Sequence, residues 1–230
     1  MEWDDEALLL AVRRHGEHAG IVSALTQGHG RVVGLVHGIV SRERRGVVQV
    51  GNRVRLWWRA RVPEQMGTLK VELVAAHAAA ALGDAGRLAA LAAGCALAER
   101  TLPERAPQPA AFAALAALLE ALPAESWATV YVHFELALLR DLGFGLDLAA
   151  CAVSGTVEDL AYVSPRTGRA VSRTAGEPWR ERLLPLPGFL TAGGEGSVAE
   201  IRDALRLTGY FLDRHAGPLP PARARLVDRF

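Results

Sequence analysis

The sequence contains very few cysteines and almost no lysine. Cys95 and Cys151 are its two cysteines, too few for the disulfide framework of a small secreted domain, so a reducing compartment such as the cytoplasm is expected. Lys70 is the single lysine, and arginine carries nearly all of the positive charge. Arginine binds phosphate through charged, bidentate contacts, although a GC-rich genome produces the same bias. The formal net charge of +1 creates no overall field that requires a nucleic-acid partner.

The sequence also lacks the long apolar runs of membrane and secreted proteins. Its first residues, MEWDDEALLL, are acidic, whereas a secretory signal begins with basic residues followed by a longer apolar stretch. The alanine-rich residues 71–82 are interrupted by Glu72 and His77, and the stretch is too short and too polar to span a membrane. We therefore expect a soluble, cytoplasmic protein without a membrane partner.

Most signatures of enzymes and metal sites are absent. The sequence has no glycine-rich phosphate loop ending in Lys and Ser or Thr, and no nucleophile elbow. Residues 193–196, GGEG, follow no expected strand and are interpreted as a linker. His15 and His18 lie three residues apart near a turn, but no cysteine or carboxylate pair completes a zinc site. We expect neither an enzyme nor a resident cofactor.

Residues 1–78 are expected to form a β-barrel. Short apolar runs separated by glycines predict five strands. The expected strands are residues 7–12, 19–25, 31–36, 53–62 and 68–74. In the fourth, the arginines and Trp57 occupy odd positions and the apolar residues even ones, which places the two sets on opposite faces. Short strands with glycine turns are typical of a small closed barrel.

The rest of the chain is expected to be mainly helical, which makes the fold class α+β with several domains. The helices expected from alanine- and leucine-rich periodic segments are residues 86–102, 109–122 and 124–142. Residues 146–190 contain many turn residues and are expected to be irregular. Ser197 and Glu200 predict the start of a helix that continues to about Asp213, and an extended, proline-containing tail should follow it.

Two arginine-rich segments and one tryptophan are candidates for contact with nucleic acid. Residues 1–78 carry eleven Arg or Lys and eight Asp or Glu, a balance of +3, while the remainder carries fifteen and seventeen, a balance of −2. The segment 41–46, SRERRG, is either a solvated turn or a phosphate-contacting loop of the barrel. Trp57 is either a packing residue or a platform for a base. The arginines between residues 166 and 182 form a second basic stretch, which an ordinary surface loop also explains.

Three motifs, in this order, resemble the RecO family. The first is RRHGE at residues 13–17, followed by Ile21-Val22, Thr26 and Gly30-Arg31. The second is the basic segment at residues 38–45, after the third expected strand. The third and most specific is FELALLRDLGFGLDLAAC at residues 134–151. Together the motifs cover about residues 5–190, and the C-terminal helix is consistent with them.

The resemblance implies both an architecture and a function. It implies an OB-fold barrel in residues 1–78, a helical domain in 79–145, a zinc-finger-like segment in 146–190, and a C-terminal helix and tail in 191–230 that pack on the helical domain. It further implies a DNA repair and recombination mediator that binds single- and double-stranded DNA and anneals complementary strands. The implied protein partners are RecR and the C-terminal tail of single-stranded DNA-binding protein, and the implied outcome is loading of RecA.

Two departures from the family pattern affect the expected sites. Relatives often carry four cysteines as a zinc site, but here Cys151 stands alone and Ser154 occupies the partner position, so no metal is expected. Relatives often carry arginine before Phe-Glu-Leu, where the partner tail docks, and His133 stands there in this chain. The residues expected to contact the tail are His133, Phe134, Leu138 and Arg140, although Phe134 and Leu138 also have the spacing of a core stripe.

The arginines of the barrel are the residues expected to bind DNA. The first choices are Arg13, Arg14, Arg31, Arg42, Arg44 and Arg45, and the second choices are Arg53, Arg55 and Arg59. Two other classes of protein stay open. A protein-interaction scaffold whose barrel has little affinity for DNA agrees with the low net charge, and DNA binding without partners would exclude it. The other class is a metal-dependent or nucleolytic enzyme, and the lack of a carboxylate cluster on any expected strand argues against it.

Overall fold

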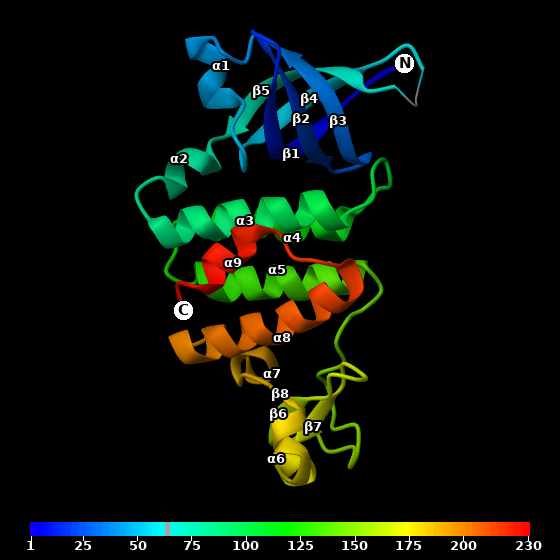
Figure 1. Cartoon of the computed structure of the whole chain (residues 1–230), viewed down its shortest axis with the longest axis vertical. Coiled ribbons are helices and arrows are strands. Elements are labelled where there is room, and N and C mark those ends of the chain that lie inside the picture. The colour runs from blue at the N-terminus through cyan, green and yellow to red at the C-terminus, as the bar shows by residue number, and fades with distance from the viewer. Residues whose placement is uncertain (63–64) are drawn as a thin grey trace.

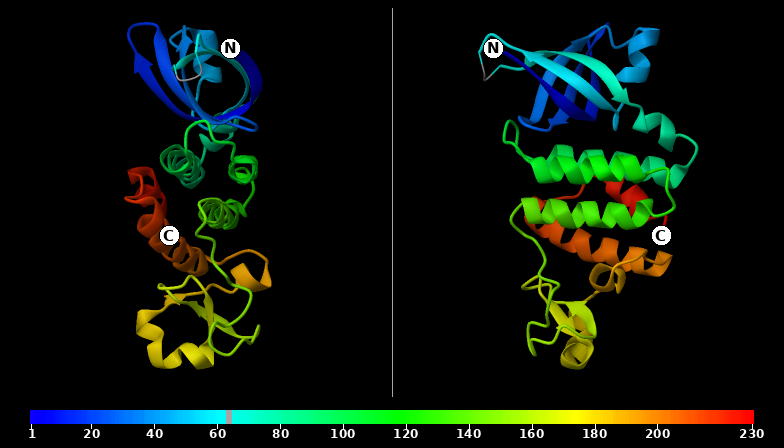
Figure 2. Two further views of the ribbon diagram at one scale, coloured as in Figure 1. Left: turned by 90° about the vertical axis from the view of Figure 1, so that its right-hand side faces the viewer. Right: turned by 180° about the vertical axis from the view of Figure 1, so that it is seen from behind.

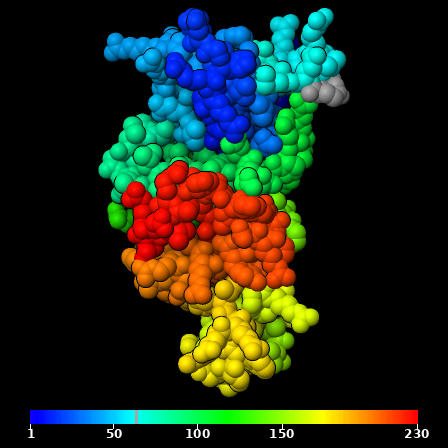
Figure 3. Space-filling view, in the orientation of Figure 1, coloured from blue at the N-terminus to red at the C-terminus, as the bar shows by residue number. Residues whose placement is uncertain are grey.

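The computed structural model describes residues 1–62 and 65–230. The chain forms layers along its long axis, with a β-barrel at one end, helices in the middle and a small three-stranded sheet at the other end (Figures 1 and 2). In the space-filling view the small sheet projects from the helical layer as a narrower unit (Figure 3). Within the described residues, no helix is both long enough and apolar enough to cross a lipid bilayer.

The barrel has the five expected strands, although the fourth ends at Arg59 and not at residue 62, and it closes in the order β1-β2-β3-β5-β4. The strands are β1 (Glu2–His15), β2 (Ala19–Thr26), β3 (Gly30–His37), β4 (Arg53–Arg59) and β5 (Gly67–Ala75). Neighbouring strands pair antiparallel, except that β3 and β5 pair parallel. A short helix, α1 (Arg42–Val47), connects β3 to β4 where a turn was one expectation, and the Ser41 hydroxyl caps it by accepting the Arg44 backbone N–H at 3.3 Å.

Strand β1 is longer than expected and is buried on both faces. Ala7 and Leu9 belong to the core of the barrel, whereas Leu8 and Leu10 belong to the core of the helical layer. This explains the unbroken apolar run in residues 7–12, because a strand covered on both sides does not alternate. The acidic start of the strand, which was not expected to be extended, pairs with β4.

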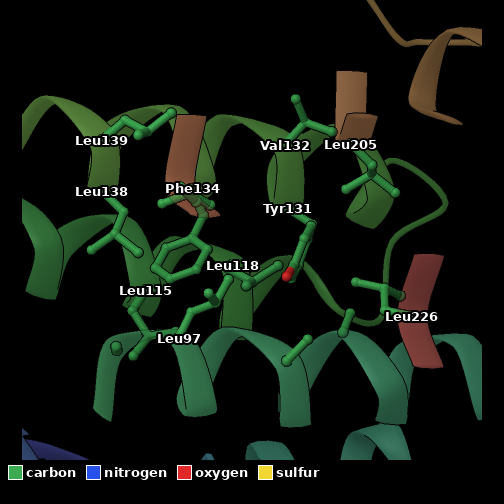
Figure 4. Close-up of a cluster of buried hydrophobic side chains, with 14 of the residues drawn as sticks. Leu97, Leu115, Leu118, Tyr131, Val132, Phe134, Leu138, Leu139, Leu205 and Leu226 are labelled. Atoms are coloured by element: carbon green, nitrogen blue, oxygen red, sulfur yellow. The ribbon is translucent and has the colours of Figure 1, made fainter. Parts of the chain in front are cut away.

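The helical layer is built mainly from four long helices. These are α3 (Ala85–Thr101), α4 (Pro109–Ala121), α5 (Trp127–Asp141) and α8 (Val198–Ala216), and α2 (His77–Ala81) leads into them from the barrel. Helices α3 and α4 lie next to the barrel, and α5 and α8 lie further from it (Figure 2). Phe134 and Leu138 project from α5 into the core, toward Leu97 of α3 and Leu115 of α4 (Figure 4). Burial of these side chains holds the helices together.

The C-terminal tail is helical, and the expectation of an extended tail is wrong. Helix α9 (Pro221–Val227) begins with Pro221 in its first turn, a position that tolerates proline because the missing N–H has no helical partner there. Arg223 of this helix is buried, and its Nε lies 2.7 Å from Oε1 of Glu135 in α5. The buried ion pair attaches the tail to the helical layer.

The small sheet makes residues 146–190 more regular than expected. It consists of β6 (Leu160–Val163), β7 (Ala170–Ser172) and β8 (Leu184–Pro185), in the order β7-β6-β8, with α6 (Arg173–Gly176), the 3₁₀ helix η1 (Glu177–Arg182) and α7 (Phe189–Ala192). Buried Cys151 accepts the backbone N–H groups of Ser154 and Ser172 at 3.5 and 3.2 Å. Among the described residues, no group of three or more His, Cys, Asp or Glu side chains is placed to hold a metal ion, so the zinc-finger-like character that the resemblance implied is not seen.

Candidate nucleic-acid interface

The nine arginines expected to bind DNA lie in three different environments. Three of them connect the barrel to the helical layer, and this role was not apparent from the sequence. Their contacts are Arg13 Nη2 with Glu99 Oε1 of α3 at 2.8 Å, Arg31 Nε with the Leu102 carbonyl at 3.0 Å, and Arg53 Nη1 with Glu120 Oε1 of α4 at 3.1 Å. Because these guanidinium groups already contact oxygen atoms of the same chain, their charge is less available to DNA.

The second environment is the outer face of β4. Arg55 and Arg59 are exposed on this face, while Val54, Leu56 and Trp58 are buried in the barrel, so the predicted alternation is confirmed. Arg55 pairs with Asp4, and Arg59 Nε lies 3.9 Å from Oε2 of Glu2. The pairs form because the acidic start of β1 runs antiparallel beside β4. These carboxylates partly cancel the attraction of the face for phosphate.

The third environment is the end of the barrel far from the helices, where α1 lies (Figure 1). It holds Arg14 and the three arginines of α1, namely Arg42, Arg44 and Arg45. The Gly38 N–H donates to the His18 carbonyl at 2.7 Å, which holds the start of the α1 connection against the β1–β2 turn. Helix α1 buries no residue, and in residues 1–62 and 65–230 none of these four side chains forms an ion pair with an acidic residue. Their charge is therefore open to phosphate.

Half-buried Trp57 lies on the arginine face of β4, as the alternation predicts. Lys70 of β5 stands opposite it, with Nζ 4.8 Å from the centre of the indole ring. Both residues line a hollow together with Trp3 and Arg59. Lys70 was not among the expected DNA-binding residues. It lies between Thr68 and Glu72 on the polar face of an alternating strand, and this alternation could have shown that its side chain is exposed. An indole beside cations is suited to stacking on bases.

Two of the four residues expected to contact a partner tail are core residues. Phe134 is 2 % exposed and Leu138 is 0 % exposed, so neither can line a groove, and both are corrected to packing residues. His133 lies at the α5 surface with its ring edge-on to Phe189, and burial lowers its pKa. The ring is then neutral at neutral pH and a poorer cation than expected. Exposed Arg140 lies on the same side of α5, two turns further on.

In the second basic stretch, in the small sheet, three of the five arginines are paired with carboxylates. Its ion pairs are Arg169 with Asp147 at 3.1 Å, Arg173 with Asp159 at 3.1 Å, and Arg180 with Glu177 at 3.6 Å. Trp179 is exposed there, with the Arg182 guanidinium 5.7 Å from the centre of its ring. The α1 end of the barrel is therefore the better candidate for phosphate contact.

Comparison with known proteins covers nearly the whole chain. Residues 1–77 match the family described as Recombination protein O N terminal, and residues 82–224 match the family described as Recombination protein O C terminal. The chain is 53 % identical to the DNA repair protein RecO of Rhodospirillum centenum, over 100 % of this chain and 95 % of the relative. It is 50 % identical to the protein of that name from Rhodospirillum rubrum and 51 % identical to that from Paracoccus denitrificans, in each case over 100 % of this chain and 96 % of the relative.

Proposed function

Because the chain belongs to the RecO family of DNA repair proteins, we propose that it is a cytoplasmic mediator of homologous recombination that binds single- and double-stranded DNA and anneals complementary strands. With RecR, it promotes the loading of RecA onto DNA coated by single-stranded DNA-binding protein. Family membership supports the role in DNA repair. The surface of the barrel supports the finer steps of DNA binding and annealing.

The observation that carries the proposal is the group of arginines at the α1 end of the barrel. Arg14, Arg42, Arg44 and Arg45 present guanidinium groups that no carboxylate of the described chain neutralises. Such groups bind phosphate without reading sequence, and the binding weakens with salt because counterions are released from the DNA. Trp57 of β4 adds a stacking ring, and Lys70 of β5, whose Nζ also lies 2.8 Å from Oε1 of Glu72, adds a cation beside it.

Annealing requires that two negatively charged strands meet without any covalent bond being made or broken. Phosphate contacts of this kind neutralise each strand and still allow it to shift its register against the other. We therefore propose that the protein is not an enzyme. After incubation of the protein with DNA and magnesium, intact DNA is the expected result, and cleaved DNA would contradict the proposal.

The surface of α5 is the proposed contact for the acidic C-terminal tail of single-stranded DNA-binding protein. Arg140 supplies a permanent cation there, and His133 supplies a ring next to Phe189. An acidic peptide with an apolar end combines the two chemistries that this surface offers. In a titration with such a peptide, labelled with a fluorophore, Arg140→Ala is expected to weaken binding. Equal binding by wild type and variant would remove α5 from the proposal.

One observation favours a second candidate function. Five of the nine expected arginines, Arg13, Arg31, Arg53, Arg55 and Arg59, lie within 4.0 Å of a carboxylate of the chain itself. A barrel with so much internal pairing could serve as a protein-interaction scaffold with little affinity for DNA. DNA binding by the purified protein, in the absence of any partner, would exclude this function.

Replacement of the α1 arginines tests the proposal. Binding of a fluorescein-labelled single strand is measured by anisotropy over a salt series, for wild type and for R42A/R44A/R45A. Each lost phosphate contact on single-stranded DNA lowers the log–log salt slope by about 0.7, so three lower it by about 2. A triple variant of exposed arginines on α8 and α9, R202A/R206A/R225A, is the matched control and should keep the wild-type slope. An unchanged slope in the α1 variant would refute the assignment.

A further inference from the structure

The acidic start of β1 lies beside the arginines on the outer face of β4. Glu2, Asp4 and Glu6 lie on one face of β1, because alternate residues of a strand point the same way, and this part of β1 pairs antiparallel with β4. The contacts with the arginines of β4 are Asp4 with Arg55, Glu2 Oε2 with Arg59 Nε at 3.9 Å, and Glu6 Oε2 with Arg53 Nε at 2.8 Å. Each arginine of β4 therefore has a carboxylate of β1 as its neighbour.

Basic and acidic side chains are equal in number on this face, which spans the paired strands β1, β4 and β5. The basic side chains are Arg53, Arg55, Arg59 and Lys70, and the acidic ones are Glu2, Asp4, Glu6 and Glu72. Arg61 follows β4 at one end of the face, and Glu120 of α4 pairs with Arg53 at the other, so the balance stays even. The face has arginines that suit phosphate, but it has no net charge to attract a strand.

The pairs made by Glu2 and Asp4 are open to solvent. In the first pair, 82 % of the Arg59 side chain and 77 % of the Glu2 side chain are exposed, and in the second the fractions are 46 % for Arg55 and 40 % for Asp4. Exposed ion pairs add little to stability, because water competes for both charges. Arg53 differs, since 27 % of its side chain is exposed and two carboxylates bind it. Arg55 and Arg59 are therefore the arginines that can exchange a carboxylate for another anion.

The carboxylates of β1 resemble a short length of phosphate backbone. Alternate residues of an antiparallel strand lie about 6.8 Å apart, close to the spacing of neighbouring phosphates on an extended single strand. Arginine binds carboxylate and phosphate through the same forked pair of donors. Glu2, Asp4 and Arg59 also line one hollow of about 460 Å³ on this side of the barrel. A strand that enters the hollow meets these carboxylates at the positions that its own phosphates would take.

We propose that the carboxylates of Glu2 and Asp4 are an internal competitor for DNA, which occupies two arginines of β4 until the phosphates of a strand displace it. The proposal rests on the proposed binding of DNA by the barrel and names a contact that limits its affinity. The backbone pairing of β1 with β4 keeps both carboxylates close to Arg55 and Arg59. They return when the strand leaves, so the contact weakens binding without blocking it.

The experiment measures the affinity of each variant for a fluorescein-labelled oligo-dT by anisotropy over a salt series. E2Q/D4N keeps the shape of both side chains and removes their charge, which releases Arg55 and Arg59. It should bind more tightly than wild type, with a log–log salt slope steeper by about 1.4, since each of two new phosphate contacts adds about 0.7. Its Tm should stay near that of wild type, because the lost pairs are exposed.

Two control variants show whether the gain comes from the arginines of β4. E2Q/D4N/R55Q/R59Q has the net charge of wild type but lacks the released arginines, so its slope should return to the wild-type value. D147N/D159N changes the net charge as E2Q/D4N does, but it acts on the small sheet, where the partners of these two aspartates are Arg169 and Arg173. Its slope should match that of wild type.

The outcomes separate this proposal from the proposed function. Absence of binding by both wild type and E2Q/D4N refutes DNA binding and the internal competitor together. Equal affinity and slope in wild type and E2Q/D4N leave DNA binding intact and overturn the competitor alone. A gain of the same size in D147N/D159N, or a gain that persists in the fourfold variant, also overturns it, because the cause is then not the release of Arg55 and Arg59. Binding by E2Q/D4N but not by wild type supports the competitor and refutes DNA binding by the natural chain.

Discussion

Replacement of Arg223 by alanine is expected to destabilise the protein strongly. Only 7 % of the Arg223 side chain and none of the Glu135 side chain is exposed. Arg223 donates to both carboxylate oxygens of Glu135, at 2.7 and 2.9 Å, and to the Leu205 carbonyl at 2.6 Å. These bonds join α9 to α5 and α8, so a single side chain connects three helices.

The expected loss of stability in Arg223→Ala follows from the Glu135 carboxylate, which stays buried without its partner. Without Arg223, the buried Glu135 carboxylate keeps the Thr208 hydroxyl, at 2.5 Å, as its side-chain donor. Loss of one partner of a buried ion pair costs about 3–5 kcal/mol, because the other charge stays desolvated. For a chain of this size each kcal/mol lowers Tm by about 2–4 °C, which gives a fall of about 6–20 °C.

The pH dependence of this contribution follows from the pKa of Arg223. Burial by itself lowers that pKa, but the charge and hydrogen bonds of Glu135 raise it above its ordinary value. A group with a raised folded-state pKa contributes its full stability below its unfolded pKa and loses it only as the pH rises through the folded-state value. The effect of Arg223→Ala should therefore be the same at neutral and at moderately alkaline pH.

Thermal unfolding followed by circular dichroism measures the effect. Arg225→Ala, at an exposed position of the same helix, is the control and should change Tm little. The double variant E135M/R223M replaces both charges by apolar groups and should be more stable than Arg223→Ala alone, since no unpaired charge remains. An Arg223→Ala variant as stable as Arg225→Ala, or a double variant less stable than Arg223→Ala, would show that the buried ion pair does not stabilise the fold in this way.

Two further predictions concern the small sheet and the contact between barrel and helices. Burial alone raises the pKa of Cys151, but hydrogen bonds from Ser154 and Ser172 outweigh it and lower the pKa to about 6. A thiol whose pKa is lower in the folded state than in the unfolded state stabilises the fold at high pH. This stabilisation is lost as the pH falls through the folded-state pKa of the thiol. Between about pH 8 and about pH 5, Tm of the wild type should therefore fall more than Tm of Cys151→Ala, and parallel curves would contradict this. Gly30→Ala should lower Tm, because its φ is +74° and an added Cβ would lie 2.1 Å from the Ala106 carbonyl oxygen; Gly46→Ala, with no atom within 4 Å of its Cβ, is the control.

The strands of the barrel could be predicted from the sequence because alternation is a local signal. Trp58 and Arg59 of β4 lie on the faces that their positions predict. The acidic start of β1 was not predicted as a strand, because Glu and Asp disfavour strands. Its carboxylates are paired with arginines of β4, which lie far along the chain. Helix α9 was missed although Pro221 at its first turn was a local signal, since the buried partner of Arg223 is not visible in the sequence.

The candidate site could be predicted only as a set of arginines. Strand register and the packing of the barrel against the helices decide which guanidinium groups have no carboxylate partner. Both depend on residues far from the arginine in the sequence. Arg13 and Arg14 are neighbours in sequence, yet Arg13 pairs with Glu99 of α3.

The most direct test of the account is the rate at which the purified protein anneals two complementary fluorescent oligonucleotides over a salt series. If the arginines of α1 bind DNA, annealing should be faster than the spontaneous rate, the acceleration should fade as salt rises, and it should be smaller for R42A/R44A/R45A. Annealing no faster than the spontaneous rate at any salt concentration would contradict this expectation and would favour a scaffold that acts through its protein partners.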